Sequence, residues 1–214
     1  MANPDTTRDG NAAANGKSAS LFPIFLKLEG RECLVVGAGS VAESKIRSLL
    51  EAGAKIRVIA PQASVTVTEW ARAGKISRDA REFQPADLDG VFLVIAATSS
   101  QSVNGTVFRE AQSRNVLCNA VDDPGNCDFY YPAVVRRGEL QIAISTAGKS
   151  PALAQKLRQD LEARYGPEYA GFVNELGEAR QQLFAREMDP EERRRLLHEL
   201  AGREAAPAGK GEVR

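Results

Sequence analysis

Cysteine, histidine and net charge are all scarce in this sequence, and each shortage excludes a class of protein. Three cysteines with no CxxC pair argue against a disulfide scaffold and suit a reducing compartment. The single histidine, His198, lies in a charged helical stretch, and no group of Cys, His and Asp has the spacing of a metal site. The 28 basic and 28 acidic residues cancel, which argues against a protein whose main partner is a nucleic acid.

Long hydrophobic runs are missing as well. No stretch reaches the length of a membrane span, and the start of the chain lacks the apolar core of a signal peptide. Residues 1–19, which are rich in Asn, Gly, Ser and Ala, and residues 205–214 have little to bury, so both are predicted to be disordered tails. We therefore expect a cytoplasmic protein with no membrane and no nucleic-acid partner.

Between the tails, apolar runs alternate with helical patterns. Strands are predicted at Glu32–Val36, Ile56–Ala60, Lys75–Arg78, Val91–Ala97 and Val116–Val121. Helices are predicted at Val41–Glu51, Val65–Ala73 and Val103–Ser113. Continuous apolar runs such as VFLVIAA are typical of strands buried on both faces, and the alternation of strands and helices predicts a parallel sheet. With right-handed crossovers, residues 20–123 are expected to form a Rossmann-like, doubly wound α/β domain.

The pattern changes after residue 123. FYYPAVV and LQIAIST flank Arg136-Arg137-Gly138, which predicts a β-hairpin with a basic turn within residues 124–149. Residues 150–204 have helical patterns, and Ser150-Pro151 and Asp189-Pro190 each supply a helix cap followed by a first-turn proline. The expected order is a nucleotide-binding domain, a hairpin segment that pairs subunits and a small helical domain.

The first strand leads into Gly37-Ala38-Gly39-Ser40-Val41-Ala42, which matches the GxGxxA form of the dinucleotide fingerprint. The first glycine allows a tight turn, the second lets pyrophosphate reach the backbone, and the alanine lets the helix pack close to the sheet. Because the motif follows a strand and opens a helix in the first βα unit, we expect Gly37 and Gly39 to bind a dinucleotide. A tight turn without a ligand is the alternative.

The second strand lacks the usual companion of this motif. It ends Ile59-Ala60-Pro61-Gln62, where an acid would normally hold the adenosine ribose of NAD. Arg57 lies too early in the strand to suit the 2′-phosphate of NADP, so these residues select neither cofactor. Backbone groups and the Gln62 side chain are the candidates for ribose recognition.

Two further strand ends carry candidate site residues, because strand ends line the ligand crevice of a doubly wound sheet. Thr98, after the fourth strand, is expected near the cofactor, and Ser99 is expected to cap the next helix. The fifth strand runs from Asn119, a candidate substrate contact, into Asp122-Asp123. A carboxylate at the mouth of a nicotinamide cleft is a candidate general base. We assign Asp122 to chemistry and Asp123 to a turn.

A third group of candidates lies before the helical segment. Gly148-Lys149-Ser150 looks like part of a P-loop, but the glycine that the motif needs five residues earlier is Ala143. The Lys149 side chain and the Ser150-capped helix start instead offer a seat for a substrate carboxylate. Helix capping alone is the alternative.

The chain resembles the siroheme-synthase dehydrogenase/chelatase family over about residues 20–165. The resemblance is carried, in order along the chain, by LFPIFLKLEGRECLVVGAGSVAESKIRSLLEAGAKIRVIAP, VIAATSSQSVNGTV, LCNAVDDP and ISTAGKSPALAQKLR. It implies NAD-dependent oxidation of the tetrapyrrole precorrin-2 to sirohydrochlorin. It also implies a homodimer joined through the hairpin and, in some members, insertion of ferrous iron into sirohydrochlorin.

The resemblance also assigns residues. The family's cofactor contacts fall on Ser40-Val41 and Pro61-Gln62, and its catalytic aspartate falls on Asp122. A serine-rich turn of the family falls on Ser145-Thr146, where the second serine is threonine here. Larger siroheme synthases carry a fused methyltransferase domain, for which this sequence has no counterpart, so uroporphyrinogen methylation is expected from another protein.

Two alternatives keep the nucleotide-binding fold but change its use. One is an NAD-binding, redox-sensing regulatory module, which needs neither an acid in the nicotinamide cleft nor a tetrapyrrole site. The other is a chelatase that inserts metal but no longer oxidises its substrate. Mixing the protein with precorrin-2 and NAD, or with sirohydrochlorin and iron without NAD, distinguishes these alternatives.

Overall fold

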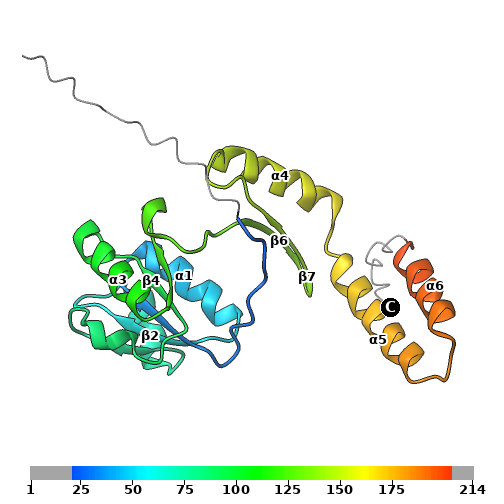
Figure 1. Cartoon of the computed structure of the whole chain (residues 1–214), viewed down its shortest axis with the longest axis horizontal. Coiled ribbons are helices and arrows are strands. Elements are labelled where there is room, and N and C mark those ends of the chain that lie inside the picture. Colours follow the sequence, from blue (N-terminus) through cyan, green and yellow to red (C-terminus); the bar gives the residue numbers. More distant parts are fainter. Residues whose placement is uncertain (1–20, 204–214) are drawn as a thin grey trace, which may run out of the picture.

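The computed structural model describes residues 21–203, which form a parallel sheet flanked by helices, a separate β-hairpin and three further helices (Figure 1). The tails predicted at residues 1–19 and 205–214 fall outside the described residues. In Figure 1 the sheet domain lies at the left and the last two helices lie at the right. The hairpin and the helix that follows it, residues 133–164, join these two parts, and we call them the arm.

The sheet has five parallel strands in the order β3-β2-β1-β4-β5. The strands are β1 Glu32–Val36, β2 Lys55–Ile59, β3 Ser77–Asp79, β4 Leu93–Ala96 and β5 Leu117–Ala120. The helices of this domain are α1 Ser40–Glu51, α2 Val65–Arg72 and α3 Gln101–Ser113. The chain moves outward from β1 to β3 and then returns to β4 on the other side of β1, which creates the switch point where doubly wound sheets bind ligands. The predicted doubly wound α/β fold is confirmed.

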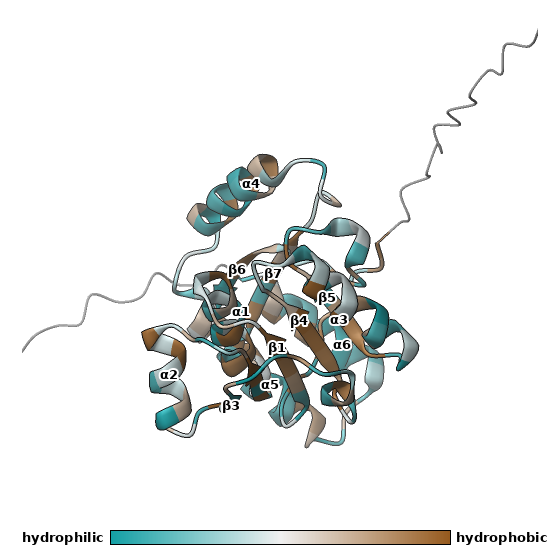
Figure 2. Cartoon of the chain, turned by 90° about the vertical axis from the view of Figure 1, so that its left-hand side faces the viewer, coloured by the Kyte–Doolittle hydropathy of each residue, from teal (hydrophilic) through white to brown (hydrophobic). Residues whose placement is uncertain are grey.

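Alternate residues of the strands build two hydrophobic layers, one on each face of the sheet. On one face Cys33 and Val35 of β1 pack in the layer that contains Ile46 of α1. On the other face Leu34 packs in the layer that contains Val107 of α3. All five side chains are at most 1% exposed. The strands therefore form the most apolar part of the domain, with more polar helices outside them (Figure 2).

Several predicted boundaries differ from the structure in ways that have simple causes. The third helix begins at Gln101, and its cap is Ser100, whose hydroxyl accepts the backbone N–H of Val103. The expectation that Ser99 is the cap is therefore wrong by one residue. The short 3-10 turn η1 Pro85–Leu88 was not predicted, because four residues are too few to show a period, whereas η2 Pro124–Asn126 lies at the turn expected after Asp123.

The hairpin pairs β6 Ala133–Arg137 with β7 Leu140–Ile144 in a two-stranded antiparallel sheet of its own. The predicted hairpin is confirmed, but its turn is Gly138-Glu139, with Gly138 at φ 56°, so the two arginines lie in β6 and not in the turn. Both arginines are the last residues of β6. The guanidinium of Arg137 donates hydrogen bonds to the carbonyls of Tyr165 and Glu162, at 2.8 and 3.1 Å.

Three helices complete the chain: α4 Pro151–Arg164, α5 Tyr169–Phe184 and α6 Pro190–Ala201. Helix α4 packs on the hairpin, and the tip of the hairpin meets the start of α5, where Gly138 lies against Ala170. Helices α5 and α6 pack on each other. No helix within residues 21–203 combines the length and the apolar character needed to cross a membrane.

A buried carboxylate fixes the connection between β3 and β4. Asp87 of η1 is 5% exposed, and its two oxygens accept hydrogen bonds from Arg81 at 2.6 and 2.8 Å. Asp87 also accepts the backbone N–H of Gln84 at 2.8 Å, and Arg57 of β2 lies 3.4 Å from it. The Arg81 hydrogen bonds hold the pKa of Asp87 below its ordinary value of 3.8, against the opposing effect of burial.

Replacement of Asp87 by Asn is expected to lower the free energy of unfolding by about 2 kcal/mol at neutral pH, because two arginines lose their buried partner. A carboxyl whose folded pKa is depressed stabilises the fold above its unfolded pKa. That contribution is lost as the pH falls through 3.8 towards the lowered value. Urea unfolding at pH 7 and at pH 3 measures both effects. Equal stability of the two proteins at pH 7 would contradict the assignment.

Candidate functional site

Most of the predicted site residues follow the carboxyl ends of strands β1, β2, β4 and β5, at one edge of the sheet. Because parallel strands end on the same side, this placement follows from the topology alone. The residues that the fold brings to this edge are Gly37, Gly39, Ser40, Val41, Pro61, Gln62, Thr98 and Asp122.

The turn after β1 is built for close backbone approach. Gly37 has φ 106°, and a Cβ atom placed there would lie 2.4 Å from the carbonyl oxygen of Ala97, so only glycine fits. Its N–H donates to the carbonyl of Ile59 at 2.9 Å, which ties β1 to β2. Gly39 differs, because a Cβ atom there would meet no atom within 4 Å. The space in front of Gly39 and the start of α1 is therefore open to a ligand, as a pyrophosphate site requires.

The end of β2 carries no carboxylate, as the sequence indicates, but the structure adds a cation there. Arg78 of β3 donates through one terminal nitrogen, Nη2, to the carbonyls of Ala60 and Pro61, both at 3.2 Å. Pro61 and Gln62 are exposed beside it. The contact between Arg78 and the end of β2 was not predicted, because it joins positions 17 and 18 residues apart on neighbouring strands.

Thr98 is held by a buried asparagine. The Thr98 hydroxyl donates to Oδ1 of Asn104 at 2.7 Å, and the Asn104 amide donates back to the Thr98 carbonyl at 3.1 Å. Asn104, on the first turns of α3, is only 4% exposed. Its role has no sequence signal, since a lone asparagine in a helical pattern is ambiguous. The pair fixes the backbone at the end of β4, beside the glycine turn.

The two aspartates after β5 have different surroundings. Asp123 starts the η2 turn, and one of its carboxylate oxygens accepts a hydrogen bond from Asn126 at 2.6 Å. Asp122 is exposed and has φ 60°, a left-handed conformation that is uncommon outside glycine. Its carboxylate has no hydrogen bond or ion pair with residues 21–203. Asp122 thus lies at the edge where doubly wound sheets bind ligands, and no described residue forms an ion pair with its carboxylate.

Asn119 lies below this edge, inside the protein. It is 7% exposed, and its amide donates to the carbonyl of Phe129 at 2.8 Å. Asn119 therefore positions the segment that leads from β5 to the arm, and its predicted contact with substrate stays a prediction.

Lys45 of α1 is a charged neighbour of Asp122 that the sequence did not single out. Its ammonium lies 3.6 Å from the centroid of the Tyr131 ring, on the segment that enters the arm. Burial lowers the pKa of Lys45, and the nearby Asp122 carboxylate opposes that shift. Burial also raises the pKa of Tyr131. One lysine thus contacts the segment that enters the arm and lies near the candidate base.

The remaining candidates lie together on the arm. Ser150 caps α4 by accepting the N–H of Leu153 at 3.2 Å, and its own N–H donates to the Thr146 hydroxyl at 3.1 Å. The hydroxyl of Ser145 accepts the N–H of Ala147. Lys149 projects from this turn and is exposed. These hydrogen bonds are local to the turn, so the described residues do not join it to the edge that carries Asp122.

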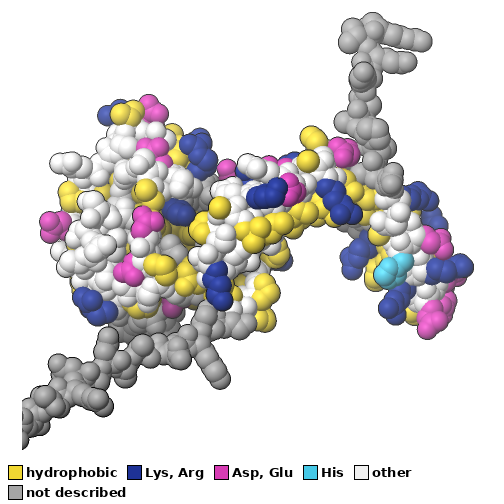
Figure 3. Space-filling view, turned by 90° about the horizontal axis from the view of Figure 1, so that it is seen from above, with side chains coloured by type: hydrophobic (Ala, Val, Ile, Leu, Met, Phe, Trp, Pro, Cys, Tyr) yellow, Lys and Arg dark blue, Asp and Glu magenta, His cyan; other side chains and the backbone are white. Residues whose placement is uncertain are grey.

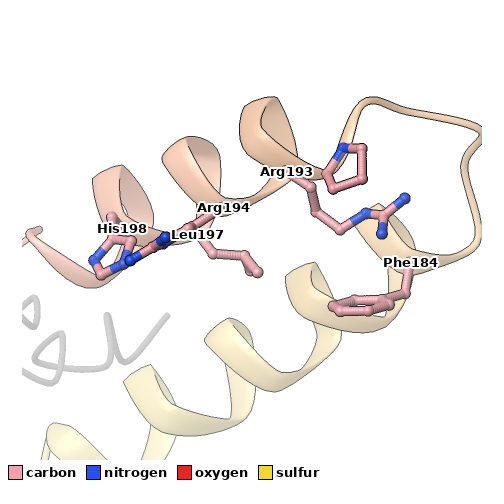
Figure 4. A pocket seen from close by; sticks show the side chains of 6 residues that line it. Phe184, Arg193, Arg194, Leu197 and His198 are labelled. Carbon is pink, nitrogen blue, oxygen red and sulfur yellow. The ribbon is translucent and has the colours of Figure 1, made fainter.

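A hollow of about 290 Å³ lies elsewhere, between α5 and α6 (Figure 4). Phe184 lies across it from Arg193, which packs 4.8 Å from the ring centroid, and exposed His198 lies at its other end. Within residues 21–203, no three His, Cys, Asp or Glu side chains are grouped so as to hold a metal ion.

Comparison with known families divides the chain at the arm. Residues 24–133 match a family described as putative NAD(P)-binding. Residues 137–164 match a family described as the central part of sirohaem biosynthesis proteins.

Curated relatives are siroheme synthases. That of Methylobacillus flagellatus is 44% identical over 168 residues, which cover 77% of this chain and 36% of the relative. That of Photorhabdus laumondii is 46% identical over 142 residues, which cover 66% of this chain and 30% of the relative. The chain thus spans roughly a third of the length of these relatives.

A solved structure matches over nearly its whole length. SirC, a precorrin-2 dehydrogenase, superposes with a TM-score of 0.74 at 31% identity, covering 84% of this chain and 89% of SirC. The match therefore includes the arm as well as the sheet domain.

Replacement of Gly39 by Val is expected to weaken NAD binding at least tenfold, or about 1.4 kcal/mol. The new side chain points into open space, so the variant is expected to fold while the branched group blocks the pyrophosphate. Calorimetric titration with NAD measures the effect, and thermal unfolding checks the fold. Gly37→Val is the contrasting variant, because its Cβ meets the Ala97 carbonyl and should destabilise the protein itself. Unchanged NAD affinity in folded Gly39→Val protein would overturn the assignment.

Proposed function

The chain belongs to the family that contains siroheme synthases and the precorrin-2 dehydrogenase SirC, and we propose from this that it catalyses the NAD-dependent oxidation of precorrin-2 to sirohydrochlorin. The observation that carries the proposal is Asp122, an exposed carboxylate without a partner in residues 21–203, held at the switch-point edge. A regulatory NAD-binding module has no need of an acid in this place.

Residues at this edge would hold NAD. The open face of Gly39 and the start of α1 at Ser40-Val41 suit the pyrophosphate, and Pro61-Gln62 suit the adenosine ribose. Thr98, fixed by Asn104, lies after β4 on the same edge. When bound, NAD supplies a hydride acceptor.

Asp122 is the proposed general base. Oxidation of precorrin-2 removes one hydride and one proton, and a carboxylate at the mouth of the cleft can accept that proton. The Asp122 carboxylate takes no part in the hydrogen bond that Asp123 forms with Asn126. Lys45 supplies a positive charge beside it.

The turn before α4 is the proposed seat for carboxylates of the tetrapyrrole. Lys149 is exposed there and the capped helix starts at Pro151, so a cation and a helix N-terminus face the same space. Ser145 and Thr146 provide hydroxyl groups in the same turn. Arg137 is not part of this proposed seat, because its guanidinium already binds the carbonyls at the end of α4.

We further propose that two copies of the chain associate through the arm, in a cytoplasmic enzyme. The two-stranded hairpin is covered on one side by α4, and α4 itself buries only Ala154. Leu153 and Leu157, one turn apart on α4, are 48% and 39% exposed. Figure 3 shows hydrophobic side chains gathered along the arm. An isolated hairpin is marginal in water, and an exposed apolar surface of this kind marks an interface.

Replacement of Asp122 by Asn is expected to slow precorrin-2 oxidation by roughly a hundredfold to ten-thousandfold, the usual contribution of a positioned general base. Asparagine keeps the size of the side chain but cannot act as the base, so the affinity for NAD should stay within about twofold. The absorbance change on mixing protein, precorrin-2 and NAD measures turnover. Failure of the unmodified protein to produce that change would overturn the proposed function, and full activity of Asp122→Asn would overturn the role of this residue.

Asp123→Asn is the matched control. Its side chain serves the η2 turn through Asn126, and Asn also serves in turns, so a small loss of stability is expected with little change in turnover. Iron insertion into sirohydrochlorin, assayed without NAD, tests the second activity of the family. If Asp122 also collects pyrrole protons, the Asp122→Asn variant loses that activity together with the oxidation.

Replacement of both Leu153 and Leu157 by Glu is expected to convert the protein from dimer to monomer. Two carboxylates per copy would then have to be desolvated in the apolar interface. Light scattering at micromolar concentration measures the mass. Lys156→Glu is the control on the same helix, because Lys156 is exposed and, within the described part of the chain, pairs with Asp160 of its own helix alone. A stable monomer mass for the unmodified protein would contradict the proposed association.

A further inference from the structure

The end of β2 is the place where doubly wound enzymes distinguish NAD from NADP. A carboxylate there binds both ribose hydroxyls of NAD and repels a 2′-phosphate, whereas an arginine there accepts the phosphate. Residues 60–64 of this chain, APQAS, contain no acid. Arg78 reaches this corner from β3, the neighbouring strand, which pairs with β2 in the register Val58↔Arg78.

The Arg78 side chain is held in place, but its positive charge has no acidic partner among residues 21–203. Its Nη2 binds the Ala60 and Pro61 carbonyls, at 3.2 Å each. Its Nε is buried without a hydrogen-bond partner, and Nη1 makes no hydrogen bond with residues 21–203. No carboxylate of the same residues forms an ion pair with it. The side chain is half-buried, so part of the guanidinium faces the surface.

The nearest acid of β3 does not neutralise this charge. Asp79 follows Arg78 in the strand, so its side chain leaves the opposite face of the sheet. There it lies 3.8 Å from Arg57 and 3.4 Å from Arg81. The acidic residues of this region are therefore gathered on the η1 side, and the α2 side of the β2 end keeps an unpaired cation.

We propose that Arg78 binds the 2′-phosphate of NADP, so that this protein accepts NADP in addition to NAD. The proposal rests on the dinucleotide site proposed above and specifies its adenosine end. The Nη1 group offers N–H donors to a phosphate, and arginine pairs with phosphate more strongly than with neutral acceptors. Helix α2 begins at Val65, three residues after Gln62, and its N-terminus adds a favourable field for an anion.

The corner is also linked to the rest of the cofactor site. The N–H of Ser64 donates to the carbonyl of Ala38, in the glycine turn, at 3.0 Å. The loop that follows β2 is thus held against the proposed pyrophosphate site. A phosphate that contacts Arg78 would therefore belong to the same bound dinucleotide.

Calorimetric titration with NAD and NADP separately tests the proposal, because the two differ only by the 2′-phosphate. We expect the unmodified protein to bind NADP within about threefold of NAD. Arg78→Leu should weaken NADP binding roughly ten- to a hundredfold, which is the loss expected for a hydrogen bond between charged groups. The same variant should change the affinity for NAD by less than about threefold. Only the NADP affinity of the unmodified protein should fall steeply with added salt.

Two further variants separate charge from structure. Arg78→Lys keeps a cation and should retain most of the NADP affinity. Arg72→Leu removes the same charge from an exposed position at the opposite end of α2 and should change neither affinity. Thermal unfolding of each variant confirms that it is folded.

Three results would overturn the proposal. The first is NADP binding more than about a hundredfold weaker than NAD by the unmodified protein, which would mean rejection of the phosphate. The second is equal weakening of both dinucleotides by Arg78→Leu, which would mean that Arg78 only supports the Ala60–Pro61 backbone. The third is unchanged NADP affinity in Arg78→Leu. Absence of binding for both dinucleotides would instead contradict the dinucleotide site itself, so the two failures are distinguishable.

Discussion

The close approach of the Gly37 turn to the end of β4 determines the geometry of the whole site. A Cβ atom at Gly37 would lie 2.4 Å from the Ala97 carbonyl oxygen, so the three innermost strands could not end together with any other residue there. The same residue donates to Ile59, which brings the end of β2 into line. Because the backbone of Gly37 lies directly against that of Ala97, α1 starts at the edge of the sheet and the space in front of Gly39 stays open. The position of each later residue, from Thr98 to Asp122, depends on that alignment.

Periodicity predicted the sheet domain well, because burial on both faces leaves a strong pattern in the sequence. The expected β1, Glu32–Val36, is the observed strand, and the GxGxxA turn lies where the motif requires. Features set by contacts between distant residues had no such pattern. In the sequence, Arg78 is simply the last residue of a weakly predicted strand. The register of that strand with β2 is what brings Arg78 to the carbonyls of Ala60 and Pro61. The assignment of Arg137 to the hairpin turn failed for a similar reason, since the carbonyls that it binds are 25 and 28 residues away.

Two side-chain contacts near the start of the arm lie next to the proposed chemistry, whereas the ion pair between Arg136 of β6 and Glu51 lies at the far end of α1. Lys45 packs on Tyr131 where the chain enters the arm, while Asn119 holds the preceding Phe129 carbonyl. Movement of the arm would therefore act on the residues around Asp122. Association of two copies through the arm would restrict such movement. This gives the proposed dimer a role in organising the site in addition to covering the apolar face of α4.

A chain with no net charge can still bind a polyanionic substrate and an anionic cofactor if its charges are segregated. Here the acids near the cofactor corner are paired: Asp87 and Asp79 with Arg81, on the η1 side of the sheet. Pairing reduces their repulsion for phosphate and leaves Arg78 without an acidic partner, among residues 21–203, on the other side. Around the proposed tetrapyrrole site, Lys149 has no acidic partner among residues 21–203, and Asp122 is a carboxylate left unpaired. An anionic substrate that approaches these cations would find in Asp122 a carboxylate available to take its proton, because Asp87, Asp79 and Asp123 are each held by a hydrogen bond or an ion pair.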